Sequence, residues 1–286
     1  MDLSIVIVTW NSEKEIGPCL RSVFSHSEGL ATETIVIDNH SSDNTKNVLA
    51  EFKNIKIISN QKNLGFAAAV NQGIAEAKGD FVLLLNPDSA IKSDSLNKMV
   101  AYLRSHRDVG VAGGKVTNFD GTIQPSVRRF PTVLDQAIIL TKLHNFFPKI
   151  VSKYFCNEFD YNLEQEVDQV RGAYYFVSRD LINKIGMLDA KNFFIWFEEV
   201  DYCRRAKNAG YKVAYVPSSV ALHEGGASFG QALSLKKQRW LNASMRNYFR
   251  KHGTALDVLV LSLLSPVSLL LAFIVQKLKI KPKKYV

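Results

Sequence analysis

Residues 3–9, with the sequence LSIVIVT, are short, β-branched and almost continuously apolar, as in a strand that is buried on both faces. Runs of the same kind recur at residues 34–38, TIVID, and 80–85, DFVLLL. Helical patterns lie between these runs, and this alternation favours a parallel sheet with helices on both faces. The sequence therefore predicts an α/β fold with a mostly parallel sheet.

The remaining elements follow from shorter patterns of the same two kinds. In the first half, we expect strands at 55–59 and 109–112 and helices at 12–25, 43–52, 67–77 and 93–105, with Ser42 as N-cap of the second helix. In the second half, we expect a turn at 118–121, strands at 167–177 and 212–216, a helix at 198–209, a basic helix at 232–251 and an apolar run at 256–275. No flexible linker divides residues 1–230, so we interpret them as one domain.

The net charge of +9 is concentrated at the C-terminus. Residues 1–224 contain 25 Lys and Arg against 26 Asp and Glu, whereas residues 225–286 contain 11 Lys and Arg and one acid, Asp257. Such a basic segment is typical of contact with an anionic membrane surface or nucleic acid, or is simply a solvated face. Because the segment also contains a long apolar run, we favour an anionic membrane surface and expect no nucleic acid partner.

Three cysteines, Cys19, Cys156 and Cys203, are odd in number and far apart. This pattern argues against a disulfide framework and against a structural zinc site, and it fits a reducing cytosol. Residues 1–15 lack a basic start and their apolar run is short, so we expect no signal peptide.

Polar residues directly after strands are the first candidates for a site, because ligands of such sheets bind at the carboxyl ends of the strands. Asp38 could accept hydrogen bonds from ribose hydroxyls or a base N–H, or could cap the polar turn that follows. Asn86, Pro87 and Asp88 follow the 80–85 strand, where a carboxylate could hold Mg²⁺ or Mn²⁺ against a diphosphate. Asn, Pro and Asp are also common in turns, so the same three residues could simply form a turn.

The loop 62–66, KNLGF, precedes a helix that carries Asn71. Gly65 permits close backbone approach, and the start of a helix can bind an anion, although a plain capping loop is equally consistent. No Gly-rich loop follows the first strand, which excludes the phosphate loop of a nucleotide-sugar pyrophosphorylase and the GxGxxG element of a dinucleotide-dependent oxidoreductase.

Three carboxylates crowd a predicted helix start at Glu198, Glu199 and Asp201. Like-charge crowding and burial raise a carboxylate pKa and suit a base, but acids also favour helix starts through the helix dipole. His223 lies between a predicted strand and a Gly-rich turn, and an imidazole there could complete a metal site with Asp88, although a lone histidine is more often structural.

The order of these motifs resembles the inverting glycosyltransferases of family 2, which have the GT-A fold, and most closely their bacterial rhamnosyltransferase-like subset. The motifs are SIVIVTWN (4–11), VIDNHSSDNT (36–45), KNLGFAAAVNQG (62–73), LLLNPD (83–88), RGAYYFVSRD (171–180), FFIWFEEVDYCRRAKNAGY (193–211) and HEGGAS (223–228). The resemblance implies a Rossmann-like sheet with flanking helices. It also implies a catalytic domain of residues 1–230, with a nucleotide-binding half (1–115) and an acceptor half (116–230), followed by a tail (231–286).

The resemblance also implies site residues. The nucleotide and donor sugar would be bound by Thr9, Asn11, Asp38, Asn63, Gly65, Phe66, Asn71, Asn86, Gly172 and Ala173. Asp88, from the family's DxD element, and His223 would bind a divalent metal, Mg²⁺ or Mn²⁺. Glu199 would be the catalytic base, with Glu198 and Asp201 as supports.

Two motifs depart from the family's pattern. The DxD element is Asn86-Pro87-Asp88 and keeps one carboxylate, and the usual Glu-Asp pair is Glu198-Glu199. Gln238, Arg239 and Trp240 lack the QxxRW spacing of processive members, so we expect transfer of a single sugar.

The implied reaction moves that sugar from a nucleoside-diphosphate sugar to a hydroxyl of a lipid-linked or polysaccharide acceptor in cell-surface glycan synthesis. The donor dTDP-L-rhamnose is favoured, and UDP- and GDP-sugars stay open. The alternative is a catalytically inactive binding subunit of a glycan-assembly complex with the same fold.

Residues 258–275 run without a charge, and as a helix they would be about 27 Å long against a hydrocarbon core of about 30 Å. Ser262, Ser265 and Ser268 interrupt the run, and Pro266 is expected to kink it. Both flanks are basic, which disfavours a single span. We therefore expect a re-entrant or interfacial helix at the cytoplasmic face of the cell membrane, with a helix packed on the domain or on a second subunit as the alternative.

Overall fold

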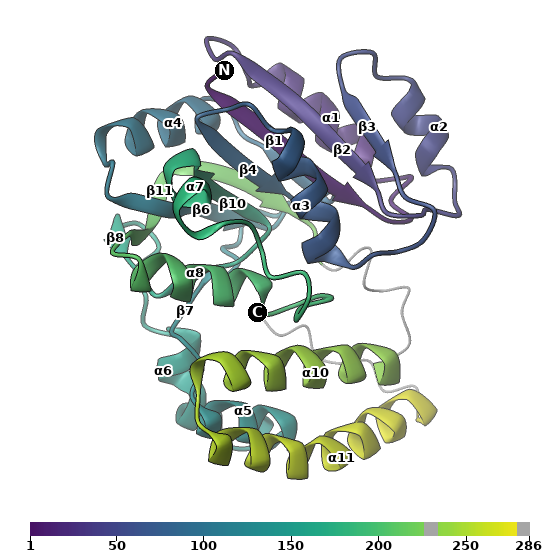
Figure 1. The fold of residues 1–286 in the computed structure, drawn as a ribbon, viewed down its shortest axis with the longest axis vertical. Coiled ribbons are helices and arrows are strands. Elements are labelled where there is room, and N and C mark those ends of the chain that lie inside the picture. The colour runs from purple at the N-terminus through teal and green to yellow at the C-terminus, as the bar shows by residue number, and fades with distance from the viewer. Residues whose placement is uncertain (226–233, 279–286) are drawn as a thin grey trace.

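The computed structural model describes residues 1–225 and 234–278, which form an α/β body above a layer of helices (Figure 1). The central sheet has nine strands in the order β3-β2-β1-β4-β10-β6-β11-β5, with β8 paired to β11. Its strands are β1 (Leu3–Thr9), β2 (Thr32–Asp38), β3 (Lys56–Ser59), β4 (Phe81–Leu85), β5 (Ser89–Ile91), β6 (Val109–Thr117), β8 (Gln165–Glu166), β10 (Tyr174–Ser178) and β11 (Lys212–His223). A small second sheet pairs β7 (Val127–Arg128) with β9 (Gln169–Val170).

The strand directions confirm the mostly parallel sheet. β1 is parallel to β2 and β4, β2 to β3, and β6 to β11. β10 is antiparallel to β4 and β6, and the short strands β5 and β8 are antiparallel to β11. The predicted single strand at 167–177 is wrong, because the chain changes sheets at residues 171–173: β9 pairs with β7, and β10 enters the central sheet. This change of sheet brings Ala173 to the end of β4.

The helices around the sheet are α1 (Ile16–Ser25), α2 (Thr45–Ala50), α3 (Phe66–Glu76), α4 (Ser95–Ser105), α7 (Arg179–Ile185) and α8 (Glu198–Asn208). α1 begins at Ile16 rather than at residue 12, and the N-cap of α2 is Asn44, so the prediction of Ser42 is wrong. The physical reason is that the two preceding loops bond to each other: Ser12 N donates to Thr45 Oγ1 at 2.8 Å, and Ser42 N donates to Asn11 Oδ1 at 2.7 Å.

Two strands are longer than predicted. β6 continues through Gly113, where a Cβ would lie 2.7 Å from Cβ of Val170, so the glycine makes room for the small sheet instead of ending the strand. β11 continues past an irregularity between Val216 and Val220 and pairs His223 with Ser89. The extension carries the histidine to the residue that follows Asp88.

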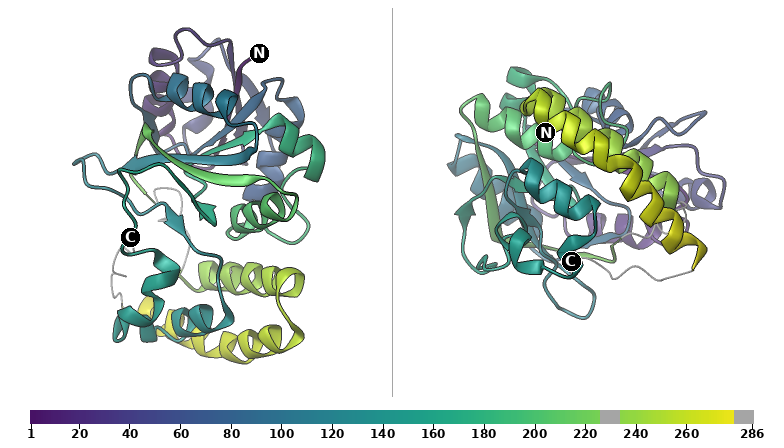
Figure 2. Two further views of the ribbon diagram at one scale, coloured as in Figure 1. Left: turned by 90° about the vertical axis from the view of Figure 1, so that its left-hand side faces the viewer. Right: turned by 90° about the horizontal axis from the view of Figure 1, so that it is seen from below.

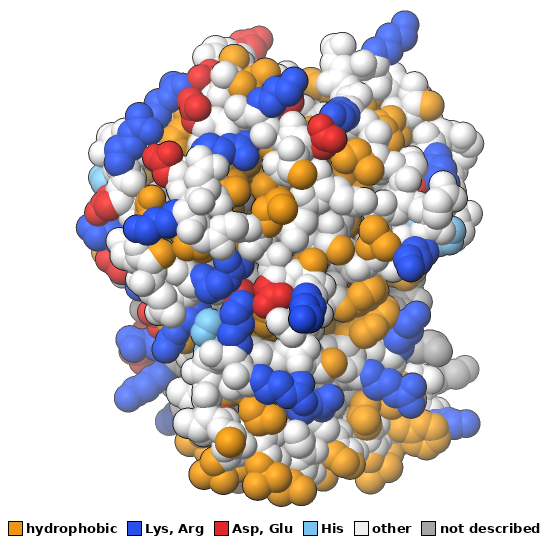
Figure 3. Space-filling model, viewed as in Figure 1, with side chains coloured by type: hydrophobic (Ala, Val, Ile, Leu, Met, Phe, Trp, Pro, Cys, Tyr) orange, Lys and Arg blue, Asp and Glu red, His pale blue; other side chains and the backbone are white. Residues whose placement is uncertain are grey.

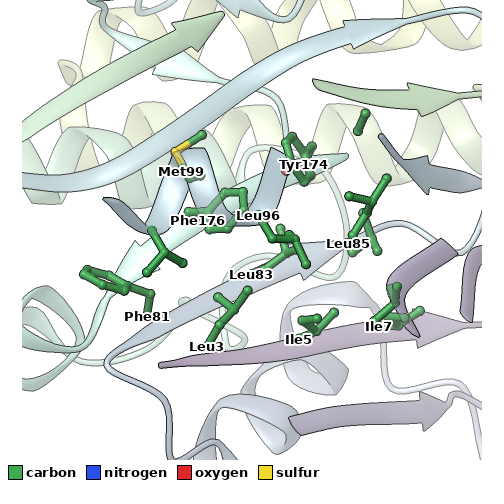
Figure 4. Packing of buried hydrophobic residues seen from close by; sticks show 14 of the residues in the cluster. Leu3, Ile5, Ile7, Phe81, Leu83, Leu85, Leu96, Met99, Tyr174 and Phe176 are labelled. Carbon is green, nitrogen blue, oxygen red and sulfur yellow. The ribbon is translucent and has the colours of Figure 1, made fainter. Parts of the chain in front are cut away.

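Apolar side chains fill both faces of the sheet. One cluster, shown in Figure 4, includes Leu3, Leu83, Met99 and Phe176 and packs α1 and α4 against the first face. The second cluster packs α3 and α8 against the opposite face. Because neighbouring residues of a strand point to opposite faces, the continuous apolar runs of β1 and β4 supply both clusters.

A layer of helices lies below this body and contains α5 (Val133–Leu140), α10 (Ser234–His252) and α11 (Ala255–Lys277) (Figures 1 and 2). The short helices η1 (Leu143–Asn145) and η2 (Pro148–Val151) adjoin α5, and α6 (Ser152–Phe155) adjoins η2. A third apolar cluster, which includes Leu140, Phe197, Tyr248 and Leu261, joins the layer to α8. A segment of the predicted acceptor half thus packs with the C-terminal helices.

The predicted basic and apolar helices are both present, as α10 and α11. α11 is a single helix of 23 residues that continues through Pro266, and it is long and apolar enough to cross a membrane. Thr254 and Asp257 form a capping box at its start. Residues 226–233, with the end of the HEGGAS motif and the predicted start of the basic helix, and residues 279–286, with the last lysines of the basic tail, lie outside the described residues.

Candidate active site

Two neighbouring strands end in buried polar side chains. Thr9 ends β1, Asp38 ends β2, and the two residues are register partners. Both are fully buried, and within residues 1–225 and 234–278 neither Thr9 Oγ1 nor Asp38 Oδ2 has a hydrogen-bond partner. Lys46 Nζ lies 3.8 Å from Asp38 Oδ2, which is an ion pair too long for a hydrogen bond. Because buried polar atoms normally have partners, these two oxygens are suited to bind hydroxyl or N–H groups of a nucleoside.

Asn11 holds the loop that follows β2. It has a φ of +50°, its Oδ1 accepts from Ser42 N at 2.7 Å, and its backbone N donates to Ser41 Oγ at 2.9 Å. Asparagine adopts this left-handed conformation more readily than most residues. The structure therefore brings Asn11 next to Thr9 and Asp38, as a residue that shapes the loop beside them.

A network of side-chain amides fixes the loop 60–65. Asn39 Nδ2 donates to Asn63 Oδ1 at 3.1 Å, and Asn39 Oδ1 accepts from Asn60 Nδ2 at 3.1 Å. Asn60 and Gln72 exchange two hydrogen bonds of 2.9 Å. The predicted residue Asn63 is thus held at the end of β2. A signal was available in the sequence, because Asn39 and Asn60 each follow a strand directly.

Gly65 is required by a close backbone approach. Its φ is +88°, and a Cβ at this position would lie 2.5 Å from the carbonyl oxygen of Phe194. Phe66 donates its backbone N–H to the same oxygen at 2.7 Å. The start of α3 is thereby held against the segment that precedes α8. The ring of Phe194 also stacks on Trp240 of α10, with ring centroids 5.0 Å apart.

The amide of Asn71 is engaged with backbone away from the Thr9 and Asp38 pair. Its Nδ2 donates to Leu188 O at 2.8 Å, and its Oδ1 accepts from Leu188 N at 3.0 Å. These two bonds join α3 to the chain that leads into α8. We therefore interpret Asn71 as a residue that positions the site.

Asp88, Asn86 and His223 meet where β4 and β11 end. Asp88 Oδ1 lies 3.2 Å from His223 Nε2, and Asn86 Nδ2 lies 3.3 Å from the same nitrogen. Gln124, which the sequence analysis missed, fixes the imidazole from its other side, since its Oε1 accepts from His223 Nδ1 at 2.9 Å and its Nε2 donates to His223 O at 2.6 Å. With Nδ1 donating, the neutral ring directs the lone pair of Nε2 toward the carboxylate. Nε2 thus faces both the Asp88 carboxylate and the side-chain amide of Asn86.

The pair of Asp88 and His223 fits a divalent cation that shares its coordination with substrate. Mg²⁺ and ions like it are commonly held by one or two protein groups, and phosphate oxygens and water complete the coordination. Both side chains are buried. Throughout the described ranges, no group of three or more His, Cys, Asp or Glu is arranged to hold a metal ion.

Gly172 and Ala173 connect β9 to β10 beside this pair. Ala173 O accepts from Asn86 N at 3.1 Å. A Cβ added to Gly172 would meet no atom of the described residues within 4 Å. Bare backbone with open space above it is suited to the close approach of a sugar ring, as expected for a donor.

Two acids, the buried Glu198 and the partly buried Glu199, begin α8 after a sharp turn. Trp196 and Phe197 have φ of +63° and +67°, which is uncommon outside glycine and fixes how the first turn of α8 enters the protein. Burial raises the pKa of Glu198 and of Glu199, and the charge of Glu199 raises the pKa of Glu198 further. The Oε2 atom of each carboxyl has no hydrogen-bond partner in the described part of the chain. A buried carboxylate with a raised pKa and a free oxygen is suited to general base catalysis.

Asp201 lies instead in an ion network that joins α8 to α10. Its carboxylate lies 2.8 Å from Arg205 Nε, 2.8 Å from Lys251 Nζ and 2.7 Å from His252 Nε2. Burial raises its pKa, but hydrogen bonds from His252, Lys251 and Arg205 outweigh burial, and the net pKa is lowered. A carboxylate that stays charged and fully paired anchors the helix rather than taking up protons.

Comparison with known proteins identifies the family. A sequence model described as glycosyl transferase family 2 matches residues 4–161, which is more than half of the chain. The chain belongs to glycosyltransferase family 2. The match includes the first four motifs, from residue 4 to Asp88, and ends before Gly172, Glu199 and His223. The resemblance expected from the order of the motifs is therefore confirmed.

Two curated relatives align with most of this glycosyltransferase. It is 28% identical over 247 residues to the N-acetylglucosaminyl-diphospho-decaprenol L-rhamnosyltransferase of Mycobacterium tuberculosis, and the alignment covers 80% of this chain and 78% of the relative. It is 26% identical over 226 residues to the low-salt glycan biosynthesis hexosyltransferase Agl10 of Haloferax volcanii, with 78% and 67% covered.

Among solved structures, the glycosyltransferase resembles the mannosyltransferase PcManGT from Pyrobaculum calidifontis in complex with GDP-Man and Mn²⁺. The TM-score is 0.59 at 17% identity, and 95% of this chain and 73% of the other are covered. At this identity the likeness concerns the fold alone, and it confirms the predicted GT-A fold.

Proposed function

We propose that this glycosyltransferase moves one sugar from a nucleoside-diphosphate sugar to a hydroxyl group of a lipid-linked or glycan acceptor in cell-surface glycan synthesis, with inversion at the anomeric carbon. The observation that carries the proposal is Glu199, whose carboxyl has a raised pKa and a buried Oε2 without a hydrogen-bond partner among the described residues, and the second part of the site is the Asp88 and His223 pair. Arg171 links the two places, because it lies within electrostatic range of both Glu199 and Asp88. A base and a site for the leaving diphosphate can then act on one donor.

The reaction needs no nucleophile from the protein. Glu199 takes the proton of the acceptor hydroxyl while that oxygen attacks the anomeric carbon. The bond from this carbon to the diphosphate oxygen breaks, and negative charge develops on the diphosphate. A single displacement of this kind inverts the configuration.

Asp88 and His223 are the residues that would hold Mg²⁺ or Mn²⁺. When bound, the ion supplies positive charge for the diphosphate as it leaves. Gln124 orients the imidazole for this role, because its bond to Nδ1 keeps Nε2 directed toward Asp88. Asn86 donates toward the same nitrogen and helps to fix the ring.

Thr9, Asp38 and the loop 60–65 would bind the nucleoside. We propose dTDP-L-rhamnose as the donor, since the mycobacterial relative is named a rhamnosyltransferase, and UDP- and GDP-sugars are the competing donors. A thermal-shift panel with dTDP, UDP and GDP, each with and without Mn²⁺, tests this choice, because a bound nucleotide stabilises the fold by about RT ln(1 + [L]/Kd). If UDP alone or GDP alone stabilised the protein, the donor would be assigned to a sugar carried by that nucleotide instead of by dTDP. If no nucleotide shifted the melting temperature, the proposal of nucleotide binding would be contradicted.

A donor-hydrolysis assay tests catalysis itself. Hydrolysis of the sugar donor by the wild type, lost in Glu199→Gln while nucleotide stabilisation is kept, supports the enzyme. Nucleotide binding with neither hydrolysis nor transfer would support the alternative, a catalytically inactive binding subunit.

We also propose that the helical layer attaches the enzyme to the cytoplasmic face of the cell membrane. The inward face of α11 carries Leu261, Ser265, Ser268 and Ala272. Its outward face is apolar, and Leu256 and Leu263 are 67% and 68% exposed. The exposed apolar residues of this face are Leu256, Leu259, Leu263, Val267, Leu270, Phe273 and Ile274. Because α10 and α5 cover the inward face, the helix is suited to lie in a membrane surface rather than to cross it.

A second segment extends this apolar surface. α5 packs beside α11, as the view from below in Figure 2 shows, and η1 and η2 pack on α5. The turn between η1 and η2 exposes Phe146 by 77% together with Phe147, and η2 exposes Ile150. In Figure 3, apolar side chains cover the lower end of the molecule, and Lys and Arg side chains form a band above them over α10. Large exposed apolar patches mark binding surfaces, and a basic border favours anionic lipid.

A further inference from the structure

The small sheet of β7 and β9 presents polar side chains on one face. Its register pairs Val127 with Val170, and Arg171 N donates to Ser126 O at 2.9 Å. Side chains at alternate positions of a strand share a face. Val127 and Val170 pack into the core, so Ser126, Arg128 and Arg171 project from the opposite face.

This face is positively charged, and its two arginines form no ion pair within the described part of the chain. Arg171 Nη1 donates to the carbonyl of Pro125 at 3.3 Å, and the Arg128 guanidinium lies over the ring of Phe155, 5.0 Å from its centroid. Among residues 1–225 and 234–278, neither arginine has a carboxylate within ion-pair distance. Burial lowers the pKa of Arg171 and the like charge of Arg128 acts in the same direction, whereas the charges of Glu199 and Asp88 act against them. An anion between the two guanidiniums would remove this repulsion.

Ser126 supplies an independent observation. It is 4% exposed, and its Oγ has no hydrogen-bond partner in the parts of the chain that the structure describes. A buried hydroxyl without a partner is rare and indicates an additional ligand or water. The hydroxyl lies on the same face as the two guanidiniums, so three side chains can donate to one oxyanion.

This face lies next to the helix that carries the proposed base. β9 packs against α8, which begins with Glu198 and Glu199. Arg171 and Arg128 both act to lower the pKa of Glu199, against the effect of burial. On its other side, Arg128 contacts α6 of the helical layer. The face therefore lies between the proposed base and the proposed membrane surface.

We propose that Ser126, Arg128 and Arg171 form a phosphate-binding site beside Glu199. The inference rests on the proposed function, in which a diphosphate accompanies each substrate. The bound group is a phosphoryl oxyanion, either of the diphosphate that links an acceptor to its lipid or of the leaving nucleoside diphosphate. Arginine suits both, because its planar fork donates two parallel hydrogen bonds to phosphate.

The test measures binding of two probes to the full chain by calorimetry. Farnesyl diphosphate represents a lipid diphosphate, and dTDP, UDP and GDP represent the leaving group. The variants are Arg128→Gln, Arg171→Gln and the double substitution, with Arg129→Gln as the matched control, since Arg129 is an exposed neighbour in the same segment. We expect each site variant to weaken the affected probe by roughly tenfold, and the double variant by more, because a charge-assisted pair is lost.

The outcomes are distinct. Loss of farnesyl diphosphate binding alone assigns the site to the acceptor, and loss of nucleoside diphosphate binding alone assigns it to the leaving group. Unchanged binding of both probes in the double variant overturns the site, as does an equal loss in Arg129→Gln. Should the arginine variants fail to fold, Ser126→Ala, which removes one hydroxyl, is expected to weaken the same probe by about threefold, and no change in that variant would overturn the site.

Failure of the proposed function has a different signature. In that case the wild type itself would neither be stabilised by any nucleotide nor hydrolyse a sugar donor. A wild type that does both, combined with unaltered phosphate binding in the variants, would contradict the phosphate site alone.

Discussion

The central sheet and the helical layer distribute polar and apolar side chains in opposite ways. In the sheet, apolar residues are buried on both faces, and buried oxygens of Thr9 and Asp38, like that of Glu199 in the adjacent α8, have no hydrogen-bond partner among the described residues. In the helical layer, hydrogen bonds join buried polar groups of α10 and α11, where Asn242 Nδ2 donates to Ser268 Oγ at 2.7 Å, and leucines face outward. The difference indicates two kinds of partner, a small polar ligand at the sheet and an apolar phase at the helices.

Polar side chains of α10 and α11 form a buried seam between the two helices, and hydrogen bonds connect its members. Gln238 Nε2 donates to Asn242 Oδ1 at 2.8 Å, and Arg246 Nη1 donates to Ser265 Oγ at 2.7 Å. Buried hydrogen bonds of this kind fix how two helices align, since any slip would leave polar groups unpaired. The seam therefore holds α11 with its leucines outward. At the sheet the situation is the opposite, because the buried oxygens of Thr9 and Asp38 have no hydrogen-bond partner among the described residues and would obtain one when a ligand binds.

Among the variants considered, we expect the largest effect from removing the proposed base, which lies beside the sheet. Glu199→Gln keeps the size of the side chain but cannot accept a proton, and we expect kcat to fall by about 10²–10⁴-fold while nucleotide binding survives. In the wild type, the rate should rise with pH through the raised pKa of Glu199, because the base must be deprotonated. Steady-state kinetics between pH 5 and pH 9 measure both effects.

Glu198→Gln serves as the companion variant, because Glu198 is the buried neighbour in the same turn. Equal losses of activity in both variants would show that the two acids act as one unit. A fully active Glu199→Gln would contradict the assignment of the base.

The next largest effect is expected from loss of the metal held by Asp88 and His223. Asp88→Asn should lower turnover by about a hundredfold, since charge stabilisation of the leaving diphosphate is worth several kcal/mol. EDTA should have a similar effect on the wild type, and added Mn²⁺ should restore it. Asp180→Asn, an exposed acid at the start of α7, is the control. Undiminished turnover in both EDTA and Asp88→Asn would contradict the metal role.

The joint between the two regions depends on Asp201. Asp201→Asn leaves Arg205, Lys251 and His252 without their buried carboxylate, and we expect a loss of about 3 kcal/mol in the free energy of unfolding. Chemical denaturation of both proteins at neutral pH measures the difference.

The pH dependence of that loss has a definite sign. The pKa of Asp201 is lowered in the folded state, so its stabilisation is present above the ordinary value of 3.8 and is lost as pH falls through the folded pKa. The gap between wild type and Asp201→Asn should therefore close in acid. A gap that stays constant down to the lowest pH at which both proteins fold would contradict the ion network.

The outward leucines of the helical layer give the smallest expected effect. Leu263→Gln and Leu270→Gln should each weaken binding to anionic vesicles by about tenfold, because each removes a side chain worth roughly 1.5–3 kcal/mol when buried in lipid. Ile57→Gln, an exposed apolar residue on β3, is the matched control. Vesicle flotation measures binding. A wild-type chain that remains monomeric and unbound would contradict attachment, and a chain that dimerises through this face would assign it to a second copy.

Much of the proposed nucleotide-binding site could be predicted, because its polar residues directly follow apolar strands in the sequence. Thr9, Asp38 and Asp88 all lie at or just after the end of such a run, and the carboxyl ends of parallel strands meet at one edge. The pairing of Asp88 with His223 needed β11 to continue past residue 216, which the irregular sequence VPSS conceals.

The rest could not be predicted because its partners are distant in the chain. Asn71 bonds to Leu188, which lies 117 residues away, and Asp201 bonds to His252, which lies 51 residues away. The face of Ser126, Arg128 and Arg171 exists only because the chain changes sheets near residue 171. Apolar runs report burial, and they do not report which strand a segment pairs with.

The stack of Phe194 on Trp240 gives the protein an optical reporter. Phe194 also covers Gly65 and holds the backbone of Phe66, at the loop proposed to contact the nucleotide base. The indole of Trp240 lies between this ring and Lys236, whose Nζ is 5.0 Å from its centroid. Indole emission depends on such neighbours, so a nucleotide that shifts Phe194 should alter fluorescence from Trp240 without any added label. Comparison with Trp240→Phe would separate its signal from those of Trp10 and Trp196.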